Sequence, residues 1–358
     1  MTRIVNAEIS VEALNHNYQR VKQISNGRRV LAMVKANGYG HGLIPVSKAL
    51  TAADALGVAR LEEGVLIAEA NIKTPVVLME GCFSEEELKT AVHHHFQIVV
   101  HAPYQVTDLL KCKSIQDAPF NVWMKINTGM NRLGFTRSKF EAAYDALKDQ
   151  KHINILGFMT HFAQADEVNV QATANQYQLF AEIVGQRPGL RSSANSAAIL
   201  AWPHTHVDWV RPGLMLYGAS PFSDKTGREL GLKPVMRLTT EIIAIQDLNP
   251  GDQIGYGGIH RCDSPQRIAI AAIGYGDGYP WSAIGAPVYV QGVVTKTLGR
   301  VSMDMIAIDI SDIPNANLRS EVEIWGPNVP VEVVAKTCKT LPYELFTRLT
   351  RRVKLQMV

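Results

Sequence analysis

The chain has 358 residues, of which 46% are hydrophobic and 19% charged, and its formal net charge at pH 7 is +3. Because a single hydrophobic core stops growing at roughly 250–300 residues, we expect two domains. The basic residues are dispersed, which argues against a nucleic-acid-binding surface, and no apolar run approaches the roughly 18 residues that span a membrane.

The cysteines and the N-terminal segment indicate a compartment. Cys82, Cys112, Cys262 and Cys338 are widely spaced and form no Cys-x-x-Cys pair. The first ten residues, MTRIVNAEIS, interrupt a short apolar stretch with polar residues, unlike a signal peptide. Both observations predict a protein of the reducing cytoplasm.

Short apolar runs alternate with helix-like segments through the first two-thirds of the chain. The runs predicted as strands cover residues 28–36, 55–59, 75–80, 97–100, 120–126, 154–160, 190–194 and 206–210. Between them lie helix-like intervals such as 61–70, 84–93, 138–150 and 170–186. Runs that are apolar on both faces are typical of a parallel sheet covered on both sides. About eight such units in roughly 220 residues favour a (β/α)8 barrel over an open doubly wound sheet.

The pattern changes after about residue 230, where strand-like stretches alternate with glycine turns. Examples are MRLTTEIIAIQDL (236–248), RIAIAAIG (267–274) and MIAIDI (305–310), with one helical segment expected over 342–351. The predicted class is therefore α/β, with a (β/α)8 TIM-like barrel over residues 1–230 and a mostly-β domain over 231–358. The first roughly eight residues are also candidates for pairing with this second domain.

Four polar residues fall at the ends of predicted barrel strands, where the active sites of such barrels lie. They are Lys35, Lys125, His161 and Arg211. Lys35 ends a run expected to face the barrel interior, where an unpaired ammonium is costly. It is thus a candidate for a lowered pKa or for covalent use as a Schiff base. Spacing alone leaves a strand-end lysine that reaches solvent equally open.

Seven segments, in order along the chain, resemble motifs of the alanine racemase family. They are AMVKANGYGHG (32–42), MKINTGMNRLG (124–134), THFAQAD (160–166), RPGLMLYG (211–218), GYGG (255–258), IGYGDGY (273–279) and GRVSMDM (299–305). The resemblance implies a barrel followed by a β domain. It also implies that pyridoxal 5′-phosphate is bound by Lys35 as a Schiff base and that alanine is interconverted between its L and D forms.

The resemblance also implies two catalytic bases. Lys35 matches the base that removes the α-proton of D-alanine, and Tyr256, in GYGG, matches the base on the opposite face, which acts on L-alanine. A racemase needs acid/base groups on both faces, so that a proton lost from one side is replaced from the other. Arg211 matches the arginine facing the pyridine nitrogen of the cofactor, and His161 matches an imidazole that lies against its ring and bonds to that arginine.

Further positions follow from the same motifs. The expected phosphate ligands are the hydroxyls of Tyr39, Ser196 and Tyr343 and the backbone N–H groups of Gly213 and Leu214. Arg132 matches the residue that bonds the phenolic oxygen of the cofactor and approaches the substrate carboxylate. Lys125 matches a lysine that is often carbamylated in the family. Met303 matches a residue of the partner subunit whose backbone N–H contacts substrate, and Asp166, Tyr275 and Arg300 match the entrance corridor.

The family pattern implies a homodimer with shared active sites, and it implies no nucleic acid or membrane partner. The product would serve peptidoglycan synthesis or alanine catabolism. Three alternatives stay open: a racemase for serine or a broader set of small amino acids, an amino-acid decarboxylase, and a non-catalytic pyridoxal-phosphate-binding protein. No metal site is expected, since the consecutive histidines at 93–95 would spread around a helix axis and converge on no acidic or cysteine partner.

Overall fold

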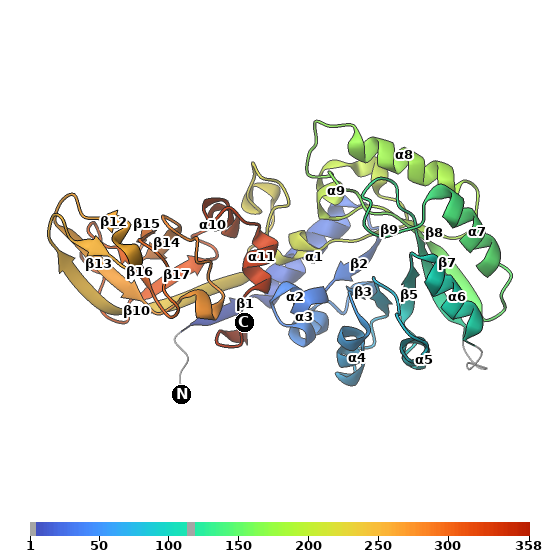
Figure 1. The fold of residues 1–358 in the computed structure, drawn as a ribbon, viewed down its shortest axis with the longest axis horizontal. Helices are drawn as coiled ribbons and strands as arrows, with labels where there is room; N and C mark the ends of the chain where they lie inside the picture. The colour runs from blue at the N-terminus through green and yellow to red at the C-terminus, as the bar shows by residue number, and fades with distance from the viewer. Residues whose placement is uncertain (1–4, 113–118) are drawn as a thin grey trace. The chain divides into compact units, whose positions relative to one another are not determined.

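The computed structural model describes residues 5–112 and 119–358 (Figure 1), and the chain divides into two compact units. The barrel unit comprises Tyr18–Gly38 and Leu43–Leu216. The β unit comprises residues 5–17, Tyr39–Gly42 and Tyr217–Val358. The boundary predicted between residues 230 and 231 stays a prediction.

Eight parallel strands close a barrel in chain order, which confirms the predicted fold of the first unit. They are β2 (Arg29–Met33), β3 (Ala55–Val58), β4 (Val76–Leu78), β5 (Gln97–Val100), β6 (Phe120–Lys125), β7 (Ile153–Met159), β8 (Leu190–Ser192) and β9 (Trp209–Val210). β9 pairs with β2, through Trp209 opposite Arg29 and Val210 opposite Val30, and so completes the ring. β3, β4 and β9 are buried at every residue, as expected for strands packed on both faces.

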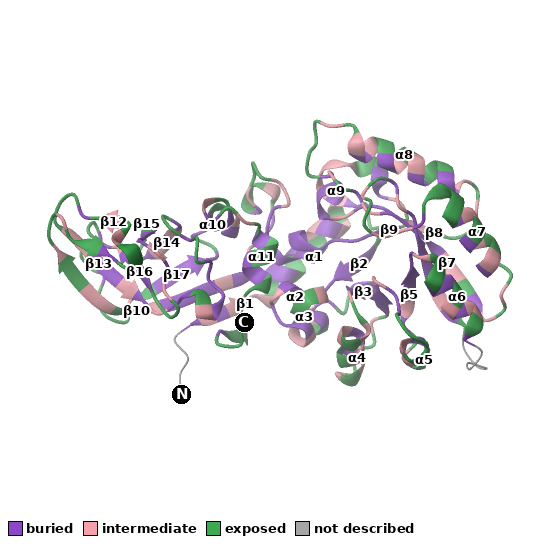
Figure 2. Cartoon of the chain, viewed as in Figure 1, coloured by how far each residue is buried: buried purple, intermediate pink, exposed green. Residues whose placement is uncertain are grey.

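Helices follow the strands and cover the barrel. They are α3 (Leu43–Ala49), α4 (Leu61–Glu69), α5 (Glu85–His93), α6 (Pro103–Lys111), α7 (Arg137–Leu147), α8 (Ala172–Val184) and α9 (Ser196–Ala201), with α1 (Val11–Ile24) before the first strand. Figure 2 shows exposed stretches along helices such as α7 and α8, while the strands of the barrel are mostly buried. α5 illustrates the local cause: Ser84 caps it by accepting the Glu87 N–H at 3.1 Å, and Leu88 and Val92, one turn apart, are buried.

The β unit is built on one eight-stranded sheet of order β13-β16-β15-β14-β17-β10-β1-β18, and β10 also pairs with β13. The strands are β1 (Asn6–Ile9), β10 (Met236–Leu248), β13 (Gln266–Ala271), β14 (Pro287–Val290), β15 (Val293–Leu298), β16 (Ile306–Asp309), β17 (Glu321–Trp325) and β18 (Lys354–Met357). β10 pairs with β17 through residues 238–241 and with β13 through residues 242–248, with a register irregularity between Ile242 and Ala244. The predicted mostly-β second domain is confirmed.

The helical segment expected over 342–351 is shorter than predicted. Two short helices are present, α10 (Val331–Thr337) and α11 (Pro342–Thr347). α11 ends at Thr347 because the following residues bond elsewhere. The Thr350 N–H donates to the Asp277 carbonyl at 3.0 Å, and the Thr350 hydroxyl donates to the Gly276 carbonyl at 2.9 Å. These tertiary bonds replace the next turn of helix.

Candidate active site

Lys35 lies two residues beyond the end of β2, on a turn of unusual handedness. β2 ends at Met33 instead of continuing to residue 36, and the next turn, α2 (Lys35–Tyr39), is left-handed. Its φ angles are 54° at Ala36, 56° at Asn37 and 61° at Gly38. Glycine adopts this conformation without steric cost, whereas Ala36 does so under strain. The chain therefore makes a left-handed turn directly after Lys35.

Three other predicted residues lie at the same ends of the barrel strands. Lys125 is the last residue of β6, His161 lies two residues beyond β7, and Arg211 lies one residue beyond β9. Lys125 is 8% exposed and Arg211 is 4% exposed. Because parallel strands end on one face of a barrel, these side chains and Lys35 share that face.

Neutral acceptors hold the Arg211 guanidinium. It donates to Ser192 Oγ at 2.7 Å, to the Ser193 carbonyl at 3.1 Å and to the Thr160 carbonyl. It also lies 3.4 Å from Nδ1 of His161. Since a guanidinium can only donate, Nδ1 accepts and the imidazole proton is on Nε2. The predicted pairing of His161 with Arg211 is thus present in the barrel unit.

Burial and mutual repulsion lower the pKa values of this cluster. Burial, followed by the charge of Arg132, lowers the pKa of Lys35, while Glu80 and Glu63 oppose the change. Burial and then Arg211 lower the pKa of Lys125 to about 8. The same two causes hold the pKa of His161 well below its ordinary value, so its imidazole is neutral. Burial lowers the pKa of Arg211 to about 10, which leaves it charged at neutral pH.

Arg132 lies on the loop that follows β6, and side-chain bonds shape that loop. Asn127 Oδ1 accepts the N–H groups of Gly129 at 3.1 Å and Asn131 at 3.0 Å. The loop closes where the Phe135 N–H donates to the Lys125 carbonyl at 2.8 Å. Arg132 is exposed, yet its charge acts on both Lys35 and Lys125. Four cationic residues therefore lie together or act on one another at this end of the barrel.

Hydrogen bonds join Ser196 to the segment after β9. Ser196, the first residue of α9, is 4% exposed, and its Oγ accepts the Gly213 N–H at 2.8 Å and the Met215 N–H at 3.4 Å. Leu214 lies between those two donors and begins the 3-10 helix η2 (Leu214–Tyr217). The structure brings together these three predicted phosphate ligands, after β8 and β9, where barrel phosphate sites are common.

In the β unit, Tyr39 and Tyr343 are neighbours. Their ring centroids are 5.9 Å apart, and Tyr39 also stacks on Tyr217 at 4.8 Å. Burial raises the pKa of Tyr39, so its hydroxyl keeps its proton and can donate. Position 40 requires glycine, because a Cβ there would lie 2.0 Å from the Phe346 carbonyl oxygen.

The remaining predicted residues of the β unit lie on exposed turns. Tyr256 is 70% exposed and lies in η4 (Tyr256–Gly258), the connection between β11 (Gln253–Ile254) and β12 (His260–Arg261). Met303 is 53% exposed on the β15–β16 loop. Tyr275 is also exposed, at the start of η5 (Tyr275–Asp277). Arg300 lies over the ring of Trp281 at 5.6 Å.

Asp166, the remaining predicted entrance residue, belongs to the barrel unit. It is exposed and lies on the loop between β7 and α8.

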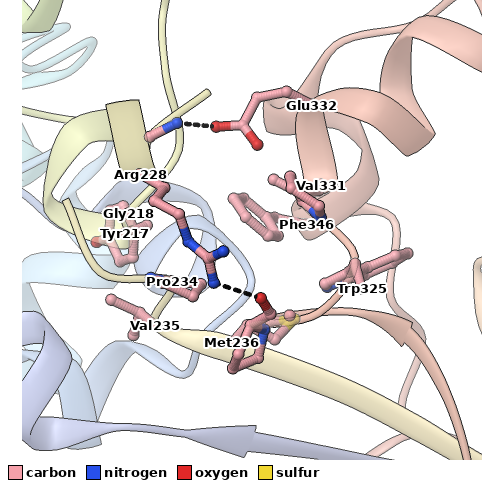
Figure 3. Close-up of a pocket in the computed structure, with 14 residues that line it drawn as sticks. Tyr217, Gly218, Arg228, Pro234, Val235, Met236, Trp325, Val331, Glu332 and Phe346 are labelled. Carbon is pink, nitrogen blue, oxygen red and sulfur yellow. Dashed lines mark hydrogen bonds between the residues drawn. The ribbon is translucent and has the colours of Figure 1, made fainter. Parts of the chain in front are cut away.

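A separate cavity of about 30 Å³ lies within the β unit between Tyr217, Trp325 and Phe346 (Figure 3). Its polar groups are engaged: Glu332 accepts the Gly227 N–H at 2.7 Å, and Arg228 donates to the Pro327 carbonyl at 2.8 Å. A space of this size suits one or two water molecules rather than an amino acid. None of the predicted site residues lines it.

Sequence reasoning missed an ion-pair chain that joins two of these turns. Arg352 contacts Asp277 at 3.0 Å and Asp304 at 2.8 Å. Next to it, the Gly276 N–H donates to the Met303 carbonyl at 2.8 Å. Asp277 was visible within the motif GYGDGY, but nothing in the basic segment around Arg352 indicated its partners.

Within residues 5–112 and 119–358, no group of three or more His, Cys, Asp or Glu side chains is arranged to hold a metal ion. In the same described segments, no helix combines the length and apolar character needed to cross a membrane.

Comparison with known proteins gives the family. A model described as alanine racemase, N-terminal domain, matches residues 9–221, and one described as alanine racemase, C-terminal domain, matches residues 235–357. The chain belongs to the alanine racemase family. Relatives that match over nearly their full length are named alanine racemase, which is an isomerase. The chain is accordingly an enzyme of that class.

Individual relatives agree with this alanine racemase assignment. The chain is 47% identical over 354 residues to an alanine racemase of Nitrosococcus oceani, covering 98% of both chains. It is similar to the biosynthetic alanine racemase structure from Pseudomonas aeruginosa, with a TM-score of 0.96, 39% identity and full coverage of both chains. A Bartonella henselae alanine racemase with covalently bound pyridoxal phosphate is 25% identical, with a TM-score of 0.91 and full coverage of both.

The barrel unit suits the cofactor implied by the alanine racemase family. Among the described residues, Lys35, Lys125, Arg132 and Arg211 form no ion pair with a carboxylate, and the nearby Glu80 pairs with Arg60 at 3.7 Å. Lys125 and Arg211 are buried and Lys35 is partly buried, and positive charge held there without a counter-ion favours an anionic ligand. A lysine with a lowered pKa suits covalent attachment to an aldehyde. The donor set of this chain therefore fits pyridoxal 5′-phosphate.

Proposed function

We propose that this chain interconverts L- and D-alanine using pyridoxal 5′-phosphate bound at the end of the barrel. The observation that carries the proposal is the cluster of Lys35, Lys125 and Arg211, which is cationic, largely buried and without a carboxylate partner in the described chain. Such a cluster is stable only when an anionic ligand or a shift in protonation offsets the repulsion. Membership of the alanine racemase family gives that ligand its identity.

The residues that would hold the cofactor follow from the site. Lys35 would bind it through its amine, and Arg132 would bond its phenolic oxygen. Its phosphate would be bound by the hydroxyls of Tyr39, Ser196 and Tyr343 and by the N–H groups of Gly213 and Leu214. When bound, pyridoxal 5′-phosphate supplies an electron sink that acidifies the α-proton of an amino acid. All other steps belong to side chains of this protein.

Two bases on opposite faces carry the proton transfer. Lys35 takes the α-proton of D-alanine and returns a proton to that face, while Tyr256 serves the L face through its hydroxyl. A proton removed on one face and replaced on the other inverts Cα, which a single base achieves poorly. The lowered pKa of Lys35 raises the fraction of neutral amine available as a base.

Arg211 supports racemisation over other outcomes. Its guanidinium keeps its proton near neutral pH and is oriented by Ser192, Ser193 and Thr160. It can donate a hydrogen bond to a ring nitrogen but hardly transfers a proton to it. By leaving that nitrogen without a proton, Arg211 would favour return of the proton to Cα over other reactions. His161, neutral and bonded to Arg211, holds this arginine in place. A decarboxylase would need an acidic group in place of Arg211.

Lys125 is proposed to carry a carbamate. Its pKa of about 8 leaves an appreciable fraction of neutral amine near neutral pH. A neutral amine attacks carbon dioxide through its lone pair and releases a proton, which leaves an anionic carbamate. This group would turn the like-charge neighbour of Arg132 into an anionic partner and help to aim Arg132 at the substrate carboxylate.

The active form is proposed to be a homodimer. Tyr256, Met303 and Tyr275 are exposed in the single chain, and a partner subunit would cover them. Met303 would offer its backbone N–H to the substrate carboxylate in the partner's site, while Asp166, Tyr275 and Arg300 would line the entrance. All four cysteines are buried, and Cys82, Cys262 and Cys338 form no disulfide within the described residues, which suits the reducing cytoplasm that we propose as its location.

The direct test is incubation of the full-length protein and pyridoxal 5′-phosphate with L-alanine. Chiral analysis should show D-alanine accumulating until both enantiomers are equal, and a parallel assay with L-serine should show slower conversion. Release of carbon dioxide without a D product would refute the proposal in favour of a decarboxylase. Equal rates for the two substrates would favour a broader racemase.

Mixing two inactive variants tests the shared site. Lys35→Ala and Tyr256→Phe should each be inactive alone, and subunit exchange between them should restore about a quarter of the wild-type activity, because a mixed dimer contains one intact site. If each chain carries a complete site, the mixture will stay inactive.

A further inference from the structure

Glu63, a residue outside the matched motifs, bridges two backbone segments at the edge of the Lys35 turn. One carboxylate oxygen accepts the Ala36 N–H at 2.6 Å, and the other accepts the Ala59 N–H at 2.9 Å. Ala36 directly follows Lys35, and Ala59 directly follows β3. Charge-assisted bonds of this kind are shorter and stronger than neutral ones. One side chain thus ties the start of the Lys35 turn to the end of the neighbouring barrel strand.

The turn that Glu63 holds needs such support. Ala36 and Asn37 both have left-handed φ angles, which cost roughly 1–2 kcal/mol for a residue with a Cβ. Strained backbone persists only where surrounding contacts determine it. Two side-chain contacts contribute: Glu63 accepts the Ala36 N–H, and Asn37 Oδ1 accepts the Leu43 N–H at 2.9 Å. Of the two, only Glu63 binds the residue next to Lys35.

Glu63 also acts on the charge of Lys35. The groups that act on the Lys35 ammonium come from several elements: Glu63 from α4, Glu80 from the segment after β4, and Arg132 from the loop after β6. Lys125 from β6 and His161 from the segment after β7 are also coupled to it. Glu63 and Glu80 favour the charged amine, whereas burial and the charge of Arg132 oppose it. Glu80 already pairs with Arg60 at 3.7 Å, whereas Glu63 forms no ion pair in the described chain.

We propose that Glu63 is a positioning residue for Lys35, which fixes the strained turn through the Ala36 N–H and sets the charge balance around the amine. The inference rests on the proposed function, because it takes Lys35 to be the amine that reacts with pyridoxal 5′-phosphate. The two parts of the role separate by substitution. Glu63→Gln removes the charge and presents an amide group to two N–H donors, whereas Glu63→Asp keeps the charge but shortens the reach.

The experiment measures how fast Lys35 reacts, without measuring racemisation. Full-length protein is stripped of cofactor and mixed with pyridoxal 5′-phosphate, and the absorbance of the covalent adduct is followed across a range of pH. The matched control is Glu62→Gln. Glu62 adjoins Glu63 in the first turn of α4 and is exposed, so its substitution makes the same change in net charge and at the helix N-terminus.

The expected result has two signatures. A nearby carboxylate raises the pKa of an amine, so Glu63→Gln should move the midpoint of the rate–pH curve to lower pH, whereas Glu63→Asp should leave it near wild type. Both variants should lower the limiting rate at high pH by about tenfold to a hundredfold, since a reacting group misplaced by about 1 Å loses rate on that scale. Glu62→Gln should match wild type in both respects.

The inference is overturned if Glu63→Gln and Glu63→Asp share the midpoint and limiting rate of Glu62→Gln. Circular dichroism melting establishes that each variant is folded, and Glu63→Asp decides the positioning role if Glu63→Gln does not fold. Reduction with borohydride and peptide mapping keep the two proposals distinguishable. An adduct absent from Lys35 in wild-type protein sinks the proposed function, whereas an adduct on Lys35 with unaltered kinetics in the variants sinks only the role of Glu63.

Discussion

The end of the barrel and the turns of the β unit hold the side chains proposed for the active site in opposite ways. Arg211 and Lys125 are 4% and 8% exposed, and Arg211 is fixed by several neutral acceptors. Tyr256 and Met303 are 70% and 53% exposed. A buried charged group must be oriented by its own chain, because leaving it unsatisfied is costly. An exposed side chain such as Tyr256 or Met303 can be oriented by contacts with a partner subunit. The barrel half is therefore preorganised within one chain, and the other half is not.

The largest effect is expected from Lys35→Ala in the barrel half. Loss of the residue that we propose as both covalent anchor and base should lower racemisation by about 10⁴-fold or more, with no covalent adduct in the absorbance spectrum. The fold should remain, because burial of the Lys35 ammonium is unfavourable and its removal costs no ion pair within the described chain. Conversion of alanine at a rate near wild type would contradict the assignment of Lys35.

The corresponding change in the β unit is Tyr256→Phe. Racemisation should fall by about 10²–10⁴-fold, because one face would lose its proposed base. The covalent adduct should keep its absorbance, and melting should change little, since the exposed side chain loses only its hydroxyl. Loss of the adduct band would show that Tyr256 serves cofactor binding or folding instead. Cofactor attachment would then not depend on the barrel residues alone.

Lys125 tests the cost of burying charge in the barrel. Its pKa falls from 10.5 to about 8 on folding, mainly through burial and then through Arg211. Below pH 8 both states are protonated and the native state carries the whole penalty. From pH 8 to 10.5 the unfolded state binds more protons, so stability rises with pH, by about 3 kcal/mol in total. Urea unfolding of cofactor-free protein in carbon-dioxide-free buffer measures this slope.

Lys125→Met should remove that slope and stabilise the cofactor-free protein at neutral pH. An equal slope in the variant would mean that other groups cause it. Addition of isotopically labelled bicarbonate should flatten the slope in wild-type protein and attach the label to Lys125, if the carbamate forms.

The smallest effect is expected from the exposed ion pairs of the β unit. Arg352→Met should cost about 1 kcal/mol, mostly because the buried Asp277 carboxylate loses a partner, while the exposed Asp304 contributes little. The control Arg348→Met breaks the exposed pair with Glu344, spaced four residues apart on the chain, and should cost about 0.3–0.5 kcal/mol. Chemical unfolding compares the two variants. Equal costs would show that burial of Asp277 adds nothing.

Local patterns were enough for most of the architecture. Apolar runs located the eight barrel strands because side chains on both faces of a parallel strand are buried, and this leaves a continuous signal. Boundaries were less certain: β2 ends at Met33 and α11 ends at Thr347, in each case where the chain turns to bonds that distant residues supply. For the site, Lys35, Lys125, His161 and Arg211 stood out because a polar residue at the end of a buried strand is costly unless it is used.

By itself, the amino-acid sequence determined the class of fold, the family and the residue types of the site, since these follow from periodicity and from motifs of a few neighbouring residues. Tertiary structure alone decided how those residues are held. Glu63 bonds to Ala36, 27 residues away in the chain, and the left-handed turn at Ala36 and Asn37 lies beside that contact. Arg352 likewise pairs with Asp277 and Asp304, which lie far from it in the sequence. A long-range hydrogen bond or ion pair leaves no local pattern, because its energy depends on distances that only folding establishes.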